Sequence, residues 1–423
     1  RIFNDRADKW GGSAENRIRF AVETVRGIKK TLGEDFPVFY RLHGSEFLPG
    51  GYGIEGAQFN AAELERAGVC FFNVTGGGHA TSVPQLTPNV PQGAYAHLAR
   101  EVKRVLQSAV VAASNRNNHP LEAERLLRLG WADMVSLGRQ SLADADWPAK
   151  VREGRFSDVR YCIACNECMD TAVIHNQPVR CLVNPRQGAI SEVVDLQKER
   201  KKRRIAVIGA GVAGLQFALT SAERGHEVTV FERKLHVGGM WHHASAPPGR
   251  EQLFSFLEWL VTQCMKANVT FKMGTEATPE LLREMSFATV AVSPGSAPVE
   301  SGLPGADLPH VHTATAALEG RIQIGERVVI VGGGGIGLEV APYLAKRWEV
   351  QPEILEFLDH YEAFSDNDRE ILARKGHHVT LVSRQRQLAG SVGASTRWVL
   401  SKEALIAGVN ILTNAVAQRI TTD

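Results

Sequence analysis

Four of the six cysteines in this 423-residue chain stand close together, at Cys162, Cys165, Cys168 and Cys181. Three closely spaced thiolates can bind one face of a cubane cluster, and a fourth from beyond a loop can complete its ligand set. Structural zinc sites usually combine two separate pairs of ligands, so zinc fits this spacing less well. Disulfides also fit poorly, because Cys162 and Cys165 are too close for a relaxed bridge. The spacing therefore favours a [4Fe–4S] cluster.

Two glycine-rich sequences follow the cysteines, and each begins where a predicted strand ends. After the strand at 204–208 come the sequence GAGVAG, a helix and a second strand at 228–231 that ends in Glu232. This order is a full dinucleotide-binding fingerprint, with a tight turn, a close approach to the pyrophosphate and a carboxylate for the ribose hydroxyls. Met240 follows a glycine pair, as in FAD-binding reductases, which favours FAD over NAD. The predicted contacts of this fingerprint are Gly209, Gly211, Gly214 and Glu232.

The second glycine-rich sequence, GGGGIG, follows a predicted strand at 328–331 and precedes a predicted helix. An insertion at 347–378 delays the next strand, at 379–382, which is followed by Ser383 and Arg384 rather than by an acid. An acid would bind the 2′-hydroxyl of NAD(H), whereas Arg384 would pair with the 2′-phosphate of NADPH. The alternative is an arginine that is merely exposed. The predicted contacts, which favour NADPH over NADH, are Gly332, Gly334, Gly337 and Arg384.

The first 156 residues alternate between helical and strand patterns, which predicts four β/α units. Four units make about half of a (β/α)8 barrel, with an α/β fold and a parallel sheet. An open sheet edge would bury unpaired backbone groups, so we expect the other half of the barrel to lie upstream. The predicted helices span 16–32, 61–67, 94–106 and 121–129, and the predicted strands span 36–42, 69–74, 109–113 and 132–137.

Charged and polar residues stand at the carboxyl ends of these predicted strands, where barrel enzymes carry their chemistry. Phosphate sites in barrels favour the loops after the last two strands, and guanidinium groups with glycine N–H groups suit a phosphate dianion. Arg41 could place positive charge beside the N1/C2=O edge of a flavin. Surface ion pairs are the alternative, but three arginines at strand ends favour a phosphate-bearing cofactor. The predicted contacts are Arg41, Asn115, Arg116, Gly138 and Arg139.

His79 follows a glycine triplet that would let the backbone approach a ligand closely. A single histidine is more often structural than catalytic. Its place at the rim of the predicted barrel nevertheless makes it our candidate for proton transfer or for anchoring a substrate.

The composition excludes several classes of protein. Apolar residues make up 44% and charged residues 22%, which are globular values. A net charge of +2 gives no electrostatic case for nucleic acid or a membrane surface. No apolar run reaches about 18 residues, and we expect neither a membrane span nor a signal peptide. Reduced thiols with a cluster fit the cytoplasm. Cys70 and Cys264 lie in apolar segments and are predicted to be buried core residues.

The first half of the chain resembles the old yellow enzyme family, through RADKWGGS at 6–13, ENRIRF at 15–20 and the Gly138-Arg139 pair. The resemblance implies FMN in the barrel, bound by the strand-end residues named above, and a proton-donating tyrosine upstream of Arg1. The two successive nucleotide-binding patterns resemble the glutathione-reductase-like flavoprotein module.

The whole chain resembles the bacterial 2,4-dienoyl-CoA reductases, most specifically through CIACN at 162–166, CLVNPR at 181–186 and PGR at 248–250. The resemblance implies that His79 assists the substrate-side acid. Two residues separate the second and third cysteines, where dienoyl-CoA enzymes usually have three, and this tighter spacing resembles the trimethylamine dehydrogenase branch. The FAD contacts that the resemblance implies are Ala213, Glu232, Met240, Arg250 and Ala277.

We therefore expect the C-terminal half of a TIM barrel, a four-cysteine segment and tandem Rossmann-like domains. The expected FMN-binding partial barrel spans 1–156, and the expected cluster segment with a charged linker spans 157–200. The expected FAD-binding domain spans 201–300, and a truncated NAD(P)-binding domain spans 301–423.

The expected activity is that of an NADPH-dependent iron–sulfur flavoprotein oxidoreductase. Electrons would pass from NADPH to FAD, through the [4Fe–4S] cluster to FMN, and on to the activated C=C bond of a 2,4-dienoyl-CoA thioester in fatty-acid β-oxidation. An amine or N-methyl dehydrogenase, running the same chain backwards, is the first alternative. A non-catalytic fragment or an electron-transfer subunit is the second. We expect a small-molecule substrate in each enzymatic case.

Overall fold

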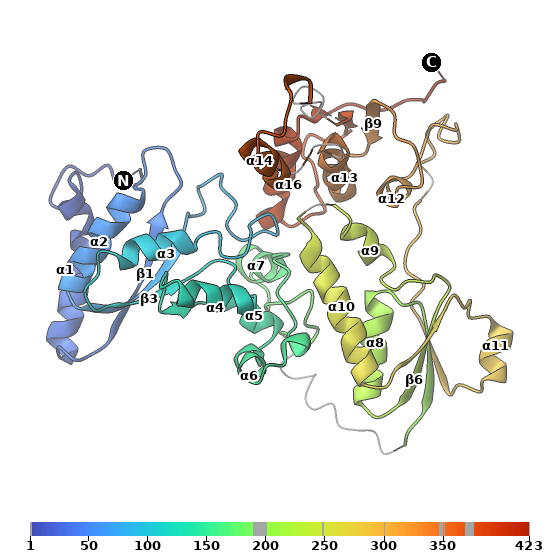
Figure 1. The fold of residues 1–423 in the computed structure, drawn as a ribbon, viewed down its shortest axis with the longest axis horizontal. Helices are drawn as coiled ribbons and strands as arrows, with labels where there is room; N and C mark the ends of the chain where they lie inside the picture. The colour runs from blue at the N-terminus through green and yellow to red at the C-terminus, as the bar shows by residue number, and fades with distance from the viewer. Residues whose placement is uncertain are drawn as a thin grey trace. The chain divides into compact units, whose positions relative to one another are not determined.

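The computed structural model describes residues 2–188, 201–247, 249–299, 301–346, 350, 352–368 and 376–422 (Figure 1). The predicted linker at 191–200 and Pro248 of the PGR sequence lie outside the described residues. The chain forms two compact units, Arg1–Cys165 and Asn166–Asp423, and each is described by itself. In the described parts of both units, every helix is too short or too polar to cross a membrane.

The first unit contains four β/α repeats, whose strands form one parallel sheet in the order β1-β2-β3-β4. Their order matches the predicted alternation, although β4 is much shorter than predicted. The strands are β1 (Val38–Ser45), β2 (Val69–Gly76), β3 (Val110–Ala113) and β4 (Met134–Val135). The helices are α1 (Ala14–Leu32), α2 (Ile54–Arg66), α3 (Ala96–Lys103), α4 (Pro120–Arg128), α5 (Gly138–Ala143) and α6 (Trp147–Arg152), followed by the 3-10 turn η1 (Phe156–Asp158).

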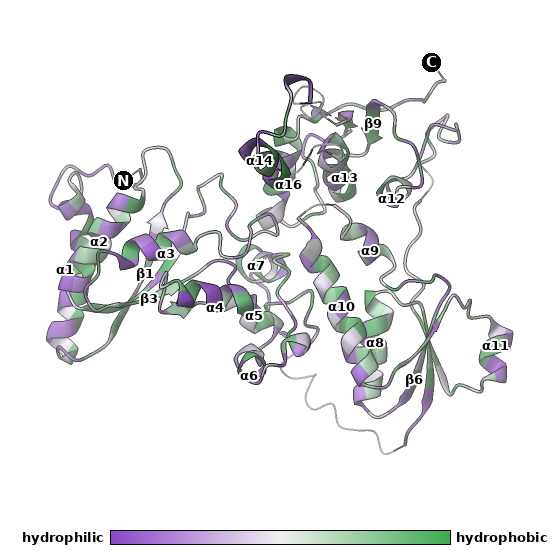
Figure 2. Cartoon of the chain, in the orientation of Figure 1, coloured by the Kyte–Doolittle hydropathy of each residue, from purple (hydrophilic) through white to green (hydrophobic). Residues whose placement is uncertain are grey.

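Helix α1 shows how local sequence sets its own ends. Ser13 is the N-cap, and its side chain accepts a hydrogen bond from the backbone N–H of Asn16. Gly33 ends the helix with a φ of 100°, a conformation that other residues rarely adopt. The helix carries both polar and apolar residues (Figure 2), and its apolar face buries Val22 and Val25 against the core.

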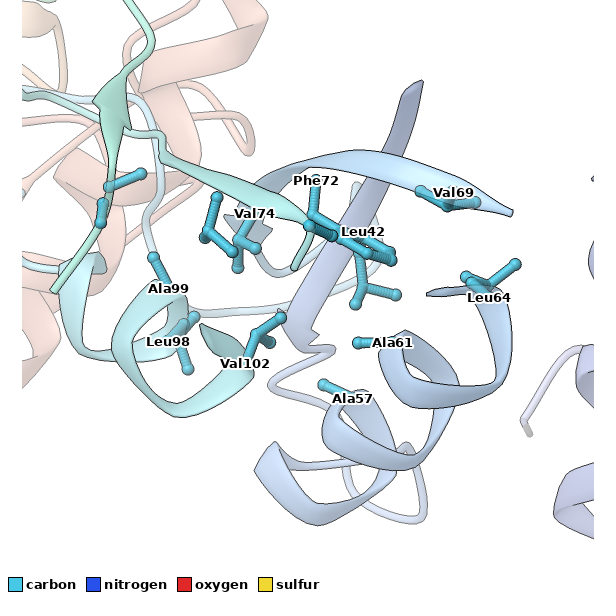
Figure 3. Packing of buried hydrophobic residues seen from close by; sticks show 14 of the residues in the cluster. Leu42, Ala57, Ala61, Leu64, Val69, Phe72, Val74, Leu98, Ala99 and Val102 are labelled. Atoms are coloured by element: carbon cyan, nitrogen blue, oxygen red, sulfur yellow. The ribbon is translucent and has the colours of Figure 1, made fainter. Parts of the chain in front are cut away.

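The core of this unit lies on one face of the sheet, between the strands and helices α2 and α3 (Figure 3). Small alanines on α2 let the helix approach the strands closely, and larger side chains of β1 and β2 fill the space between them. The side chains labelled in Figure 3 are Leu42, Ala57, Ala61, Leu64, Val69, Phe72, Val74, Leu98, Ala99 and Val102.

Cys70 corrects one prediction, because this residue is exposed rather than buried. Val38 pairs with Val69 and Phe39 pairs with Phe71, so Cys70 is an extra residue in a β-bulge between the two pairs. The bulge takes Cys70 out of the alternation that would have buried it. Cys264 is fully buried, as predicted.

The second unit begins with α7 (Glu167–Met169) and the π-helical turn η2 (Asp170–Ile174), and then forms two parallel sheets. The first sheet has the order β7-β6-β5-β8 and the second the order β11-β10-β9. The strands are β5 (Arg204–Ile208), β6 (Glu227–Glu232), β7 (Thr270–Met273), β8 (Thr289–Val292), β9 (Arg327–Val331), β10 (His378–Val382) and β11 (Asn410–Leu412). The further helices are α8 (Val212–Glu223), α9 (Met240–Ala244), α10 (Glu251–Lys266), α11 (Pro279–Glu284), α12 (Ala314–Leu318), α13 (Gly335–Lys346), α14 (Pro352–His360) and α16 (Ala394–Ile406).

Candidate functional site

The sheet of the first unit carries polar side chains near its carboxyl ends. Arg41 lies beside Asn73, and His43 lies beside Thr75, in the parallel register of β1 and β2. The Thr75 hydroxyl donates to Asn115 Oδ1 at 2.7 Å, which connects this row to the loop after β3. The structure therefore brings the predicted Arg41 and Asn115 to the same end of one sheet.

A cavity of about 410 Å³ opens beside β1. Arg41 and His43 line it together with Arg17 of α1 and with Tyr40 and Tyr52. The lining thus combines two guanidinium groups with aromatic rings. Such a lining can hold a planar, electron-rich or anionic group.

His43 is a candidate that sequence reasoning missed. Burial lowers the pKa of its imidazole, and the charges of Arg41 and His79 lower it further, while Glu46 acts in the opposite direction. The ring is therefore uncharged near neutral pH. The predicted His79 is exposed, in the loop after β2. The sequence signal that could have found His43 was its spacing from Arg41, because residues two apart on a strand share a face of the sheet.

Arg116 is the most unusual polar residue of this unit. Its side chain donates from Nη1 to the carbonyls of Thr87 at 3.0 Å and Pro88 at 2.9 Å. The residue is only 7% exposed, and its Nε and Nη2 have no partner among the described residues. Burial, and then the charge of Arg139, lower the pKa of the guanidinium to about 10, while Cys162 opposes the shift. Buried donors without partners fit an anionic ligand such as a phosphate.

Arg139 lies close enough to Arg116 for their charges to repel. Its Nη1 donates to the carbonyl of Leu86, one residue before the carbonyls that Arg116 contacts. Gly138 begins α5, and a Cβ placed on it would meet no atom within 4 Å. The structure therefore brings Arg116 and Arg139 to the loop at 86–88, whose role the sequence did not indicate, and Gly138 directly precedes Arg139.

Asn115 and Arg116 both adopt the left-handed backbone conformation, with φ values of 67° and 57°. Two successive non-glycine residues in this region store conformational strain. Strain of this kind is common at sites that must aim a side chain at a ligand. It supports the prediction that the loop after β3 contributes to the site.

Cys162 is held by two buried amide side chains. Its backbone N–H donates to Gln140 Oε1 at 2.9 Å, and its carbonyl accepts from Asn118 Nδ2 at 3.2 Å. Ala164, with a φ of 56°, directs its own N–H at the Cys162 sulfur, 3.4 Å away. A sulfur that accepts a backbone N–H, close to the cation of Arg116, fits a thiolate ligand.

The four predicted ligands are divided between the two units. Cys162 and Cys165 belong to the first unit, and Cys168 and Cys181 belong to the second. Each cysteine is half-buried, and none of the four forms a disulfide. Within the described residues, no group of three or more His, Cys, Asp and Glu side chains is gathered as a metal site. The four-cysteine ligand set therefore stays a prediction, which the sulfur donors and the contacts of Cys162 support.

The segment after Cys168 makes a long-range contact within the second unit. Asp170 is only 6% exposed, and its Oδ1 accepts from the backbone N–H of Ser395 at 3.0 Å. Its Oδ2 accepts from the Ser395 hydroxyl at 2.8 Å. Gly393, the N-cap residue of α16, has no side chain to make such a bond, and a Cβ there would lie 1.9 Å from Asp170 Oδ2. Asp170 therefore caps α16 in place of a local residue.

The first glycine turn of the second unit connects β5 to α8. A Cβ on Gly214 would lie 2.0 Å from the carbonyl oxygen of Gly209, so only glycine allows this close packing. Gly211 bridges to Gly238, and a Cβ on Gly211 would meet no atom within 4 Å. Glu232, at the end of β6, accepts from the backbone N–H of Ala210 at 2.9 Å. This arrangement leaves an open glycine cradle beside a carboxylate, which fits a dinucleotide.

The other predicted FAD contacts lie around this cradle with different degrees of support. Ala213 is in the first turn of α8, and Met240 begins α9 directly after the glycine pair. Ala277 lies just before Thr278, the N-cap residue of α11. Arg250 forms an ion pair with Glu339 at 2.8 Å. Its side chain therefore contacts α13, the helix that follows the second glycine turn.

The second glycine turn repeats the first. A Cβ on Gly337 would lie 2.0 Å from the carbonyl oxygen of Gly332, the same geometry as at Gly214. Gly332 N–H donates to the carbonyl of Val382, which makes β10 the neighbour of this turn despite the insertion. In the first turn Gly209 N–H donates in the same way to the residue before Glu232.

Ser383 therefore occupies the position that corresponds to Glu232. It is buried, and a Cβ on Gly333 would collide with it. Arg384 follows and is exposed at the carboxyl end of β10. Gly334 has open space around its Cα, as Gly211 does. Among the described residues, the end of β10 therefore carries an exposed cation, Arg384, in place of an acid.

Comparison with known proteins supports the same division of the chain. Residues 1–158 match the NADH:flavin oxidoreductase / NADH oxidase family, and residues 203–423 match the pyridine nucleotide-disulphide oxidoreductase family. These matches confirm the predicted fold class, a barrel-type flavin domain followed by Rossmann-like nucleotide-binding domains.

Individual relatives share both parts. A metal reductase from Desulforamulus reducens is 36% identical over 417 residues, which cover 97% of this chain and 62% of that protein. An NADH oxidase from Thermoanaerobacter brockii is 37% identical over 350 residues, 81% of this chain and 54% of its own. The structure of a 2-naphthoyl-CoA reductase with 2-naphthoyl-CoA has a TM-score of 0.89 and 28% identity, covering 100% of this chain and 60% of that chain. The chain thus spans between 54% and 62% of the length of these relatives.

Proposed function

This chain belongs to the old yellow enzyme-like NADH:flavin oxidoreductases that carry a pyridine nucleotide-disulphide oxidoreductase domain, and we propose that it reduces an activated C=C bond with electrons from NADPH. The observation that carries the proposal is the pair of glycine cradles in the second unit. Both have the same close helix-to-turn packing, but one ends in Glu232 and the other in Ser383 and Arg384. Two cradles of different charge suit two different nucleotides, FAD and NADPH.

The residues of the first unit supply the second flavin site in this proposal. Arg116 and Arg139 bind the phosphate of FMN in this proposal, and Arg41 stabilises negative charge on the flavin ring. The buried, unpartnered donors of Arg116 support the first of these roles. When bound, NADPH, FAD, a [4Fe–4S] cluster and FMN supply hydride transfer and single-electron transfer. The protein residues bind and orient these groups.

In this proposal, histidines near the carboxyl ends of β1 and β2 take part in proton transfer. His43 is uncharged near neutral pH, because burial and the nearby arginine lower its pKa, so it can accept or relay a proton. His79, in the adjacent loop, anchors the substrate or assists its acid. We also propose the division into a flavin barrel at 1–156, a cluster segment at 157–200, an FAD domain at 201–300 and a nucleotide domain at 301–423.

The substrate that we propose is a 2,4-dienoyl-CoA thioester, in a pathway of fatty-acid oxidation in the cytoplasm. The likeness to a 2-naphthoyl-CoA reductase, whose substrate is also a conjugated CoA thioester, supports this class. The sequence at 181–186 supports it as well. The alternative is an amine or N-methyl dehydrogenase, which the two-residue spacing between Cys165 and Cys168 favours.

The test is an anaerobic titration of the purified protein with NADPH, followed by absorbance. We expect all of the bound flavin to be reduced, both FAD and FMN. Reduction of FAD alone, with FMN remaining oxidised, would contradict the proposed route. Comparison of turnover with a dienoyl-CoA and with methylated amines then separates the reductase from the dehydrogenase.

A further inference from the structure

Gln140 is a buried amide that the proposed function does not use. It follows Arg139 in α5 and is only 2% exposed. Its Oε1 accepts from the backbone N–H of Cys162 at 2.9 Å, and its Nε2 donates to the carbonyl of Arg160 at 3.0 Å. A single side chain therefore binds the backbone on both sides of Tyr161, directly before the first pair of cysteines.

Asn118 completes the contact from the loop after β3. Its Nδ2 donates to Gln140 Oε1 at 3.1 Å and to the carbonyl of Cys162 at 3.2 Å. Gln92 and Trp147 bind Asn118 in turn, at 2.7 Å to its Oδ1 and 2.9 Å to its carbonyl. Networks of buried, paired amides are rigid, because each unpaired group would carry a desolvation penalty.

The two amides therefore fix both backbone polar groups of Cys162. When both the N–H and the C=O of a cysteine are hydrogen-bonded, its backbone conformation is fixed. The direction in which its Cα–Cβ bond points is then fixed as well, and only the side-chain rotamer can still change. The N–H of Ala164 also donates to the sulfur of Cys162, at 3.4 Å. The two amides belong to the same segments as the two arginines. Asn118 is two residues after Arg116, and Gln140 directly follows Arg139.

We propose that Gln140 is a positioning residue that fixes Cys162 as a ligand of the iron–sulfur cluster and joins this ligand to the arginines of the phosphate site. The inference rests on the proposed function, because it assumes that Cys162 binds a cluster. Gln140 acts through the backbone of Cys162 and does not touch the metal. It belongs to the class of residues outside the ligand set that orient the ligands.

The test replaces Gln140 with methionine, which keeps the side-chain volume but removes its hydrogen bonds to Cys162, Arg160 and Asn118. Gln58→Met is the matched control, because Gln58 Nε2 also donates to a backbone carbonyl of this unit, that of Glu101 at 2.8 Å. Each variant is reconstituted with iron and sulfide under anaerobic conditions. The measurement is the rate at which a chelator removes iron, followed by the cluster absorbance.

Loss of such an orienting contact typically weakens metal binding about 10–100-fold. We expect iron loss from Gln140→Met to be faster by that factor, and iron loss from Gln58→Met to stay within about twofold of the unchanged protein. Equal rates in the two variants would overturn the inference. Absence of iron and sulfide from the unchanged protein would instead refute the cluster itself, and with it the proposed function.

A second measurement keeps the inference testable if Gln140→Met does not fold. Hydrogen exchange in the unchanged protein reports directly on the N–H of Cys162. The bond to a buried, networked amide predicts slow exchange there, comparable with the amides of β2. Exchange as fast as in an unfolded peptide of the same sequence would overturn the proposed contact.

Discussion

Replacement of Asp170 by alanine tests whether the segment after Cys168 holds the nucleotide-binding part of the second unit. The substitution removes both hydrogen bonds to Ser395, so the first turn of α16 loses its only cap among the described contacts. The N–H and hydroxyl of Ser395 are then left to water. We expect α16 to open locally more often while the rest of the unit stays folded.

The size of the effect follows from the two bonds. Loss of a helix cap costs about 1 kcal/mol, and loss of a hydrogen bond to a charged group costs about 1.5–3 kcal/mol. Part of this loss is offset, because the variant no longer carries the desolvation penalty of a buried carboxylate. A net effect of about 2 kcal/mol corresponds to roughly 30-fold faster exchange, at about 1.4 kcal/mol for each factor of ten.

Hydrogen exchange followed by mass spectrometry is the suitable assay, since a chain of several domains does not unfold in one step. Peptides from α16 should exchange roughly 30-fold faster in Asp170→Ala, while those from α8 should be unchanged. Thr278→Ala is the control, because Thr278 caps only its own helix α11, at Leu281. That variant should affect α11 and leave α16 as it was.

A double-mutant cycle makes the reasoning refutable. In Gly393→Ala the new Cβ would lie 1.9 Å from Asp170 Oδ2 and should expel the carboxylate. Both single variants would then break the same contact, so the double variant should be little worse than either one. Fully additive effects, or unchanged exchange in α16, would show that Asp170 does not hold the helix.

Three further predictions concern the proposed cofactor sites. Arg384→Ala should raise the KM for NADPH about 10–100-fold and leave the KM for NADH unchanged, because the charge-assisted bond from Arg384 to the 2′-phosphate contributes about 1.5–3 kcal/mol. Steady-state kinetics with both nucleotides measure this. Gly214→Ala should lower the FAD content of the purified protein, because its Cβ would collide with Gly209, whereas Gly27→Ala, with open space around it, should not. The lowered pKa of His43 means that the unfolded chain takes up its proton first as the pH falls below 6.5. Stability should therefore decrease from pH 7 downwards, less steeply in His43→Gln, and identical pH profiles of the thermal midpoint would contradict this.

The periodic parts of the fold were predictable from sequence because they depend on local patterns. Strand β5 occurs at the predicted residues, since a buried apolar run ends there at a glycine turn. The insertion did not disturb the second cradle, because β10 still pairs with β9 in register. Helix α2 begins earlier than predicted, at Ile54, because burial of Ala57 against the sheet outweighs the nearby glycines.

Strand β4 is shorter than predicted for a reason that no pattern reveals. The backbone N–H of Asp133 donates to the carbonyl of Val111 at 2.8 Å, but its side chain, rather than a backbone carbonyl, accepts from the N–H of Val111 at 2.9 Å. A carboxylate thus replaces one of the backbone acceptors at the start of β4. The candidate site shows the same limit. The arginines were predictable by residue type and position, but the carbonyls at 86–88 that bind them carry no sequence signal. Buried amides such as Gln140 look like any other polar residue until the backbone that they contact is known.

The cap that Asp170 provides to α16 has a consequence for how the chain is made. The carboxylate and the helix are 225 residues apart, so the carboxylate leaves the ribosome long before its helix exists. The C-terminal nucleotide fold can cap α16 in this way only when the cysteine segment is present. Expression of the two nucleotide folds alone should therefore start at Asn166 rather than at the charged stretch before β5, because the later start would discard the group that completes the last long helix.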